Sequence, residues 1–433
     1  MARQRFGSLF AFLLYSLVFP FVNSQALTND QIDQVKTRLA EGARQSWELG
    51  TRAQALIEYD VPFYSVLNDT SLPPPQDGPA GQLSEVFSIV QDVVGNRSRS
   101  NDDIQGPQPF MQDGSAADPA SLGVAVLLAN WTGLSSSDGL DYAGAAQDQL
   151  NYLLNEVPRT SDGAISHRVS QVQLWSDFVY MVPPFLAYYG VLTDNQTLVR
   201  EAYNQIKLYR DYLRDDGANG LWKHVLLGSS GNDEGHWSTG NAWAAAGMLR
   251  VLGTIQHSPF PKSFKNEQKD LQKWVTEIMD GMYPWLQPSG LFRNYADNNS
   301  TFEDASSTAL LTSAVYRHSL LSGVHRHLPD AERSRQALSA PANSSNPPAP
   351  NNSNSSLVHF TSNMWLTPVV NPHSYGVQGR ESPEGQAFVV EMQAAWRDWV
   401  NDGSKGANGA LKTGGSPNAI AVAVAAILAL RLW

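Results

Sequence analysis

An acidic residue inside an apolar, aromatic stretch is the first candidate for chemistry in this chain. In the segment GAISHRVSQVQLWSDFVYMVPPFLAYYG, residues 163–190, Asp177 follows Trp175 and precedes a run of aromatic and aliphatic side chains. An ionised carboxylate in such surroundings is costly unless it is paired or protonated. Two interpretations stay open from these residues alone: Asp177 caps the helix that follows, or it takes part in a reaction.

A second group of polar and aromatic residues lies in the segment 221–252. Indole rings offer flat faces to sugar rings, and imidazole and amide groups can hydrogen-bond hydroxyls, which together suits a ligand site. The alternative is that the tryptophans pack in the core and the histidines bond carbonyls. With no HExxH motif and no cysteine, we expect no metal ion and no other cofactor. The residues of this group are Trp222, His224, His236, Trp237, Asn241 and Trp243.

A second acid stands at another predicted helix start, in DGSAADPASLGVAVLLANWTG, residues 113–133. As a lone motif, Asp118 followed by Pro119 is typical of a helix N-terminus, and one interpretation is that its role is only structural. Alternatively, it is a partner for Asp177. Two carboxylates that converge in an aromatic pocket have their pKa values pushed apart, which gives one proton donor and one anion at the same pH.

The elements that must position these residues are almost all helices. Apolar side chains recur at three- and four-residue steps, and most connections contain Gly, Pro, Asn or Asp. Eleven or twelve helices in consecutive pairs predict an all-α fold of helical hairpins in a ring. Pro183 and Pro184 should kink one helix, and strand-like alternation is confined to 357–365. The predicted helices span 28–58, 82–94, 118–133, 138–155, 175–190, 195–213, 238–256, 264–286, 303–323, 329–338 and 384–400.

Composition excludes some classes of partner. The chain has 433 residues, 42% of them hydrophobic, which is enough for a large core. Its net charge is −11 and it has no run of Lys or Arg, so we expect neither nucleic acid nor an anionic membrane surface as a partner. There is no cysteine, so stability must come from the core rather than from disulfides.

The N-terminal segment resembles a secretory signal. Basic residues precede the apolar run LFAFLLYSLVFPFV, so we expect residues 1–24 to be a signal peptide and the mature chain to begin near Gln25. Nine Asn-X-Ser/Thr sequons also predict a secreted or cell-surface glycoprotein. They begin at Asn68, Asn96, Asn130, Asn195, Asn298, Asn299, Asn343, Asn351 and Asn354.

The C-terminal segment 401–433 combines a small, polar stretch with the apolar tail AIAVAVAAILAL. The tail would span roughly 22 Å as a helix, less than the ~30 Å hydrocarbon core of a bilayer. We therefore expect a signal for a glycosylphosphatidylinositol (GPI) anchor, with a weakly membrane-associated helix as the alternative. Between the two ends we predict one domain over 25–400, with a disordered, Pro-, Asn- and Ser-rich insertion at 339–356.

Several motifs together resemble those of the unsaturated glucuronyl and rhamnogalacturonyl hydrolases, glycoside hydrolase families 88 and 105. They are DYAGAAQDQLNYLLNEVPRTSDGAISHR, LWSDFVYMVPPFLAYYG, LWKHV, GHWSTGNAW, FEDASSTALLTSAVYR and SPEGQAFVVEM. The resemblance runs over roughly 110–400, and 27–100 fits as the expected first hairpin. It implies an (α/α)6 barrel of six helical hairpins, the six-hairpin glycosidase fold.

The resemblance also implies roles for single residues. Asp177 corresponds to the catalytic acid/base of the family and Asp118 to its second active-site aspartate. The family hydrates the C4=C5 vinyl ether of an unsaturated uronic acid, which requires a carboxyl that protonates carbon and then activates water. For contact with the substrate we expect His167, Arg168, Trp175, His224, Trp237, Asn241 and Trp243.

One motif departs from the family pattern. The family reads Trp-X-Arg-Gly-Asn-X-Trp, whereas this chain reads WSTGNAW, with Thr239 in the arginine position. Arginine binds a carboxylate with two hydrogen bonds and threonine cannot, so the recognition of a uronate needs another cation. Arg168 and Lys223 are the two candidates.

The expected function is that of an extracellular glycoside hydrolase that acts on oligosaccharides of the unsaturated-uronyl type, derived from pectin or rhamnogalacturonan. One alternative is a catalytically inactive glycan-binding protein of the cell surface. Another is an enzyme that remodels cell-wall polysaccharide on the same barrel. Such enzymes carry adjacent catalytic aspartates, and here the Asp-Asp pairs, 102–103 and 215–216, lie in polar loops.

Overall fold

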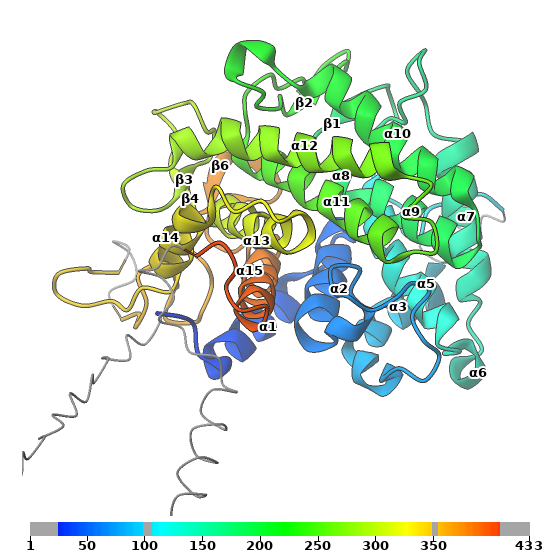
Figure 1. The fold of residues 1–433 in the computed structure, drawn as a ribbon, viewed down its shortest axis with the longest axis horizontal. Coiled ribbons are helices and arrows are strands. Elements are labelled where there is room, and N and C mark those ends of the chain that lie inside the picture. The colour runs from blue at the N-terminus through cyan, green and yellow to red at the C-terminus, as the bar shows by residue number, and fades with distance from the viewer. Residues whose placement is uncertain (1–24, 98–105, 349–353, 408–433) are drawn as a thin grey trace, which may run out of the picture.

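The helices form two layers, an inner ring and an outer shell (Figure 1). The computed structural model describes residues 25–97, 106–348 and 354–407. In the ring each helix contacts the next, and the last helix returns to the first. The ring consists of α2 (Ser46–Asp60), α5 (Gly123–Trp131), α8 (Phe178–Met181) with α9 (Pro183–Leu192), α11 (Ser238–His257), α13 (Ala305–Ser322) and α15 (Pro383–Asn401).

The outer helices alternate with the inner ones along the chain and pack against their outer faces. Figure 1 shows, for example, α12 lying along α11. The outer shell consists of α1 (Asn29–Gly42), α3 (Ser84–Gly95), α7 (Tyr142–Asn155), α10 (Gln196–Leu213), α12 (Lys265–Met282) and α14 (Leu328–Leu338). Six outer–inner pairs in the described part of the chain confirm the predicted (α/α)6 barrel. Within the described residues, the short helix α6 (Ser135–Asp138) and five 3-10 turns lie in the connections.

The two layers differ in sequence because they differ in burial. The outer helix α10 buries one face, with Leu198, Ala202, Ile206 and Tyr209 at helical spacing, and exposes charged residues on the other. The inner helix α11 is buried from Ser238 to Ile255, so its side chains are mostly apolar or small on every side, with Asn241 and Arg250 as the buried polar exceptions. Small side chains let its backbone approach a neighbour closely. A Cβ added to Gly247 would lie 2.1 Å from the carbonyl oxygen of Val179.

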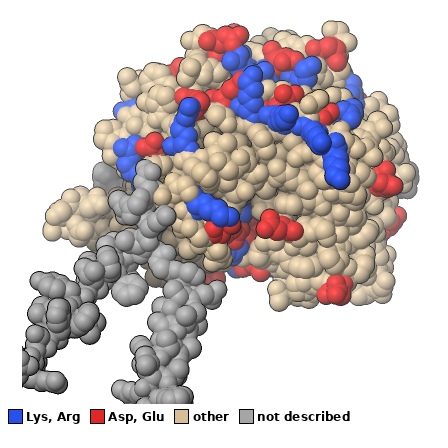
Figure 2. Space-filling model, in the orientation of Figure 1, with Lys and Arg blue, Asp and Glu red and all other residues tan. Residues whose placement is uncertain are grey.

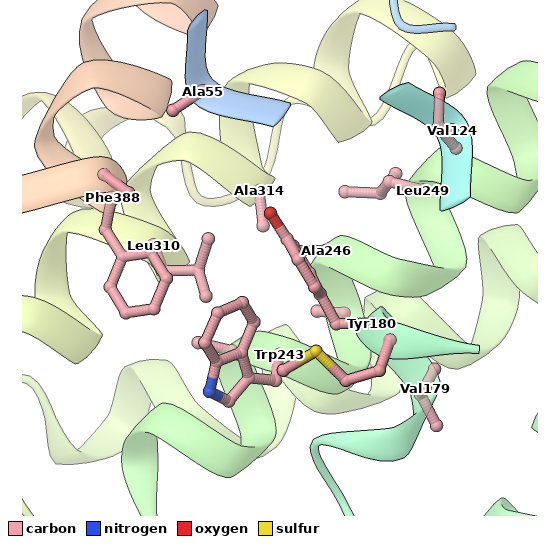
Figure 3. Packing of buried hydrophobic residues seen from close by; sticks show 14 of the residues in the cluster. Ala55, Val124, Val179, Tyr180, Trp243, Ala246, Leu249, Leu310, Ala314 and Phe388 are labelled. Atoms are coloured by element: carbon pink, nitrogen blue, oxygen red, sulfur yellow. The ribbon is translucent and has the colours of Figure 1, made fainter. Parts of the chain in front are cut away.

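Large aromatic side chains fill the middle of the ring (Figure 3). Trp243 of α11 lies with its ring centroid 4.2 Å from that of Tyr180 and 4.6 Å from that of Phe388, both in edge-to-face geometry. Tyr180 comes from α8 and Phe388 from α15, so Trp243 joins three inner helices. Leu310 of α13 points toward the same group in Figure 3.

Short antiparallel strand pairs tie together the loops that lead into the inner helices. β1 (Leu174–Trp175) pairs with β2 (Val225–Leu226), β3 (Phe292–Arg293) with β4 (Glu303–Asp304), and β5 (Val369–Asn371) with β6 (Ser374–Gly379). Strands β1, β2, β4 and β6 come before α8, α11, α13 and α15 respectively. The loops at the N-terminal ends of these helices are therefore held side by side.

Three predicted elements differ from the structure. The helix expected over 28–58 is two helices, because the chain is extended at Ala43 and Gln45. The helix expected over 175–190 breaks before Pro183, as the proline pair predicted, and α9 starts there. The strand-like alternation at 357–365 is not a strand. Leu357 and Phe360 form only isolated bridges, because turns interrupt the segment while it buries these two side chains.

The insertion at 339–356 is described at both ends. Its two arms are joined by a hydrogen bond from the Ala342 N–H to the Ser356 carbonyl, and Asn343 and Asn346 exchange backbone hydrogen bonds. Its middle, the expected signal peptide at 1–24 and most of the C-terminal tail lie outside the described residues. Among the helices of the described ranges, none has both the length and the apolar character needed to cross a membrane.

Charges of both signs are mixed on the face seen in Figure 2. Basic side chains lie beside acidic ones along its upper part, and much of the rest of this face is uncharged. Some charged residues of the outer helices form ion pairs, such as Arg210 of α10 with Glu277 of α12 at 2.5 Å. Pairs of this kind on the surface stabilise the fold only slightly.

Candidate active site

A cavity of about 260 Å³ lies where the loops before the inner helices meet. It combines four tryptophans with four carboxyl groups, three histidines and one arginine. Its walls are formed by Trp47, Asp113, Asp118, His167, Arg168, Trp175, Asp177, Met181, His224, Trp237, Trp243, Pro372, His373, Tyr375 and Glu384. A second hollow of about 390 Å³ is lined by residues of α2 and α3, among them Leu49, Ile89 and Val93, and contains none of the predicted site residues.

Asp177 lies at the N-terminus of α8, but its side chain does not cap that helix. Its carboxylate lines the cavity instead and is 12% exposed. Ser176 donates a hydrogen bond of 3.3 Å to one carboxylate oxygen, and His224 Nε2 lies 3.7 Å from the other. Of the two interpretations open from the sequence, the geometry therefore disfavours helix capping.

The pairing of β1 with β2 places His224 beside Asp177. Trp175 of β1 pairs with Val225 of β2, and the Ser176 N–H bonds the His224 carbonyl at 2.9 Å. On its other side, His224 Nδ1 lies 2.9 Å from Asp233, which also accepts a hydrogen bond from the Tyr295 hydroxyl. Burial alone would lower the pKa of His224, but the carboxylates of Asp177 and Asp233 outweigh burial and raise it.

For Asp118 the surroundings disfavour the charged form, whereas for His224 they favour it. It begins the 3-10 turn η3 (Asp118–Leu122), and its carboxylate lies 3.4 Å from His167 Nε2. Burial first, and then the charges of Asp113 and Asp177, hold the pKa of Asp118 well above its ordinary value. His167 cannot offset this as a cation, because burial lowers its pKa to about 3. Asp118 is therefore a carboxyl that keeps its proton to higher pH than an exposed aspartate does.

Trp175 separates two parts of the cavity wall. Its indole stacks on the His167 ring, with centroids 5.0 Å apart and planes 13° apart, and meets the His224 ring edge-on at 5.3 Å. Trp237 contacts His224 from the other side at 4.4 Å, and its indole N–H donates to Asn294 at 2.9 Å. The indoles thus hold both histidine rings in place as well as forming the wall of the cavity.

The departure at Thr239 is explained by a local contact. Thr239 is fully buried, does not line the cavity, and its hydroxyl donates to Asp304 at 3.2 Å. Of the two candidates for a replacement cation, Lys223 pairs with Glu234 at 2.7 Å and lies outside the cavity wall. Arg168 lines the cavity, with its guanidinium 5.8 Å from the Trp175 ring.

One predicted contact lies elsewhere. Asn241 is completely buried and does not line the cavity. Its side-chain oxygen accepts the Trp222 N–H at 2.8 Å, and its amide donates to the carbonyls of Trp222 and Trp237, each at 3.0 Å. The expectation that Asn241 contacts the substrate is therefore corrected: its polar atoms are engaged by the backbone of the loop that carries Trp237. Trp222, at 1% exposure, is likewise a core residue.

Part of the wall was not predicted from the sequence. Trp47 comes from α2, His373 and Tyr375 from the β5–β6 hairpin, and Glu384 from the first turn of α15. Trp47 stands at an apolar position of an amphipathic pattern, and Glu384 is an ordinary acid at a helix start. Such signals are the same for a core or surface residue, so only the closure of the ring brings these residues to Asp177.

Comparisons with known proteins agree with this architecture. The sequence profile of Glycosyl Hydrolase Family 88 matches residues 115–343, which is more than half of the chain. The unsaturated rhamnogalacturonyl hydrolase YesR of Bacillus subtilis is 23% identical over 184 residues. The match covers 40% of this chain and 51% of YesR, so the chain spans about half the length of this curated relative.

Solved structures with low sequence identity share the fold. A possible member of family GH105 from Salmonella enterica has a TM-score of 0.62 at 17% identity, covering 86% of this chain and 93% of that one. A family 88 glycosyl hydrolase from Bacteroides vulgatus has a TM-score of 0.57 at 13% identity, covering 86% and 100%. The unsaturated glucuronyl hydrolase of Bacillus sp. GL1 has a TM-score of 0.54 at 12% identity, covering 85% and 94%. The family profile and the six-hairpin barrel together place this chain in glycosyl hydrolase family 88.

Proposed function

We propose that this protein is a glycoside hydrolase that hydrates the C4=C5 double bond of an unsaturated uronyl residue at the end of an oligosaccharide. The observation that carries the proposal is that Asp177 and Asp118 line one tryptophan-walled cavity and that neither side chain is consumed by helix capping. Family 88 membership supports the reaction class, and the name of the B. subtilis relative supports a substrate derived from rhamnogalacturonan.

In this proposal Asp177 is the acid/base. Its carboxyl gives a proton to C4, and the resulting carboxylate takes a proton from the water that attacks C5. The hemiketal formed at C5 then opens and releases the rest of the sugar. The proton taken from the water returns Asp177 to its acid form, so the cycle needs no other proton source. His224, with Asp233 behind it, lies 3.7 Å from Asp177 and holds the carboxyl in position. The neutral carboxyl of Asp118 is placed to donate a hydrogen bond to the bound sugar.

Arg168 supplies the positive charge for the uronate in this proposal. It is the one Lys or Arg among the residues that line the cavity. Thr239 cannot serve, because it is buried against Asp304 and away from the cavity. A guanidinium can bind a carboxylate with two parallel hydrogen bonds, which fixes the plane of the uronate as well as its charge.

The test is incubation with a panel of lyase-generated unsaturated oligosaccharides while the absorbance near ~235 nm, which reports the conjugated double bond, is followed. We expect loss of the signal with the parent protein and no loss with Asp177→Asn. Asp270→Asn is a matched control, because Asp270 lies on α12 and accepts a hydrogen bond from Tyr203. If the parent leaves the absorbance unchanged across the panel, the proposal is wrong.

A glycan-binding protein without turnover is the second candidate, and the loss of the family arginine at 239 is the observation that favours it. Binding of the panel sugars without any change in absorbance, unaltered by Asp177→Asn, would select it. The remodelling enzyme is disfavoured. Within the described residues, the pair 215–216 lies outside the cavity, where Asp215 caps the turn η4 (Asp216–Ala218) and Asp216 is exposed beside Arg214.

We also propose that the protein acts outside the cell and is held there by a lipid anchor. The sequon asparagines of the described residues are accessible, and all but the partly buried Asn68 are exposed, which suits N-glycans. A loss of apparent mass on treatment with an N-glycosidase would support the secretory route. Release from intact cells by a phosphatidylinositol-specific phospholipase C would support the anchor, and retention after that treatment would contradict it.

A further inference from the structure

Glu384 is a buried acid of the cavity that the proposed reaction does not use. It stands in the first turn of α15, is 3% exposed and lines the cavity together with Asp177. The indole N–H of Trp47 donates to its Oε2 at 3.1 Å. Its Oε1 is buried without a hydrogen-bond partner among the described residues. A buried carboxyl with one free oxygen costs free energy unless a ligand completes its hydrogen bonds.

The surroundings of Glu384 are acidic. Burial first, and then the charges of Glu48, Asp177 and Asp304, hold its pKa well above the ordinary value, and the bond from Trp47 opposes this only in part. Glu384 thus carries a proton over a wider pH range than an exposed glutamate, so its free end can donate a hydrogen bond as well as accept one. A negatively charged group of a ligand placed beside Glu384 would be repelled by Glu48, Asp177 and Asp304.

The two ends of the cavity therefore differ in charge: one carries the positive charge of Arg168, and the other is surrounded by acids. Arg168 is among the groups that lower the pKa of Asp118, whereas Glu48, Asp177 and Asp304 are the charges that act most strongly on Glu384. An anionic group of a ligand is favoured near the arginine and disfavoured near Glu384. Both Trp47 and Glu384 lie outside residues 115–343, so the family match assigns them no role.

We propose that Glu384, held by Trp47, is a specificity-determining residue that hydrogen-bonds an uncharged hydroxyl of the bound sugar and keeps sulfate and carboxylate groups out of its end of the cavity. The inference rests on the proposed function and narrows its substrate class. The unsaturated uronate directs its carboxylate toward Arg168, and the sugar oxygens that reach Glu384 belong to unsulfated, neutral positions. Such a site fits pectin-type disaccharides, in which a neutral sugar follows the uronate, better than sulfated glycosaminoglycan fragments.

The test measures binding in the Asp177→Asn background, so that no turnover is required. This variant removes one of the three charges near Glu384 and keeps Glu48, whose charge acts most strongly, and Asp304. The probes are the unsaturated, unsulfated chondroitin disaccharide and its mono-sulfated counterparts, which share one skeleton, with affinity measured by calorimetry. We expect the sulfated disaccharides to bind at least about tenfold more weakly than the unsulfated one. Sulfated and unsulfated forms that bind equally well would overturn the exclusion of anions.

Substitution of Glu384 tests the hydrogen bond itself. Glu384→Ala should weaken binding of the unsulfated disaccharide about tenfold, because a buried hydrogen bond is lost, whereas the isosteric and neutral Glu384→Gln should stay within about threefold. Trp47→Phe keeps an aromatic side chain and removes the indole N–H, so it should fall between the two. Circular dichroism and the melting temperature establish that each variant is folded.

The outcomes separate this inference from the proposed function. If the parent protein leaves the absorbance of the whole oligosaccharide panel unchanged, but Asp177→Asn binds the disaccharide and Glu384→Ala weakens that binding, the reaction is refuted and the role of Glu384 stands. If Glu384→Ala binds like its parent, or if Glu384→Gln loses as much as Glu384→Ala, the role of Glu384 is refuted. Absence of binding of every probe to the Asp177→Asn protein refutes it as well.

Discussion

The Nε2 atom of His224 lies 3.7 Å from a carboxylate oxygen of Asp177. The same imidazole contacts Asp233 through Nδ1 at 2.9 Å, so it connects the proposed acid/base to a second carboxylate. Because the ring is fully buried between Trp175 and Trp237, it cannot turn away from either partner. Asp233, which lies outside the cavity wall, thereby acts on the imidazole that faces Asp177.

Removing the charge behind His224 should slow the reaction without weakening binding. Asp233→Asn keeps the size of the side chain but leaves His224 with one carboxylate instead of two, so the imidazole holds its proton less firmly. We expect kcat to fall about tenfold or more, KM to change little, and the pH optimum to move. Tyr295→Phe removes only the hydrogen bond to Asp233 and should have the same effect in weaker form. Steady-state kinetics over a range of pH measures this, and an unchanged pH profile in Asp233→Asn would contradict the coupling.

Asp118 should act as a neutral group. Because burial, Asp113 and Asp177 hold its pKa above the ordinary value, it stays protonated to higher pH than an exposed aspartate and ionises only when the pH rises further. We therefore expect KM of the parent protein to rise with pH as Asp118 ionises, and KM of Asp118→Asn to show less of this rise. Near neutral pH the Asn variant should bind substrate within about threefold of the parent, since an amide can replace a neutral carboxyl as a donor. A large loss of affinity in Asp118→Asn at every pH would show that the ionised form is the one required.

Arg168 should be the residue that recognises the uronate carboxylate. Arg168→Gln removes the one Lys or Arg of the cavity wall, so we expect KM for unsaturated uronyl substrates to rise about tenfold or more. The matched control is Lys223→Gln, because Lys223 is paired with Glu234 outside the cavity and should leave KM unchanged. Equal effects of the two substitutions would mean that long-range charge, rather than a contact, is responsible.

Acid should destabilise the fold through buried histidines. Burial lowers the pKa of His318 to about 4 and that of His167 to about 3, so both are neutral in the native state at pH 5 while they are protonated in the unfolded chain. The unfolded state thus binds more protons, and these two groups lower the free energy of unfolding as the pH falls below about 6.5, by up to about 1.4 kcal/mol per pH unit for each histidine. Above that pH both histidines are neutral in the folded and the unfolded chain, so they no longer lower the free energy of unfolding. Urea unfolding of the parent and His318→Gln at pH 7, 6 and 5 isolates one of them: the difference in stability should shrink as the pH falls, and parallel curves would contradict it.

The local features that the sequence specifies are the ones with a short-range physical cause. Periodic burial predicts the helices, and Pro183, which has no amide hydrogen to donate, ends α8 and starts α9. The alternation at 357–365 resembles a strand, but the prediction was wrong because turns, rather than a sheet, bury Leu357 and Phe360. In the same way Asn241 resembled a sugar contact, although its amide is consumed by the carbonyls of Trp222 and Trp237.

The sequence by itself determined the all-α class, the helical hairpins and the candidates Asp118 and Asp177, because periodicity and an acid in an apolar segment can be read from neighbouring residues. Only the tertiary structure decided which groups meet. Ring closure brings Trp47 and Glu384, which are separated by 337 positions, within one hydrogen bond of each other. Burial, which depends on all the helices together, then decides that Asp118 keeps its proton and that His167 loses its own.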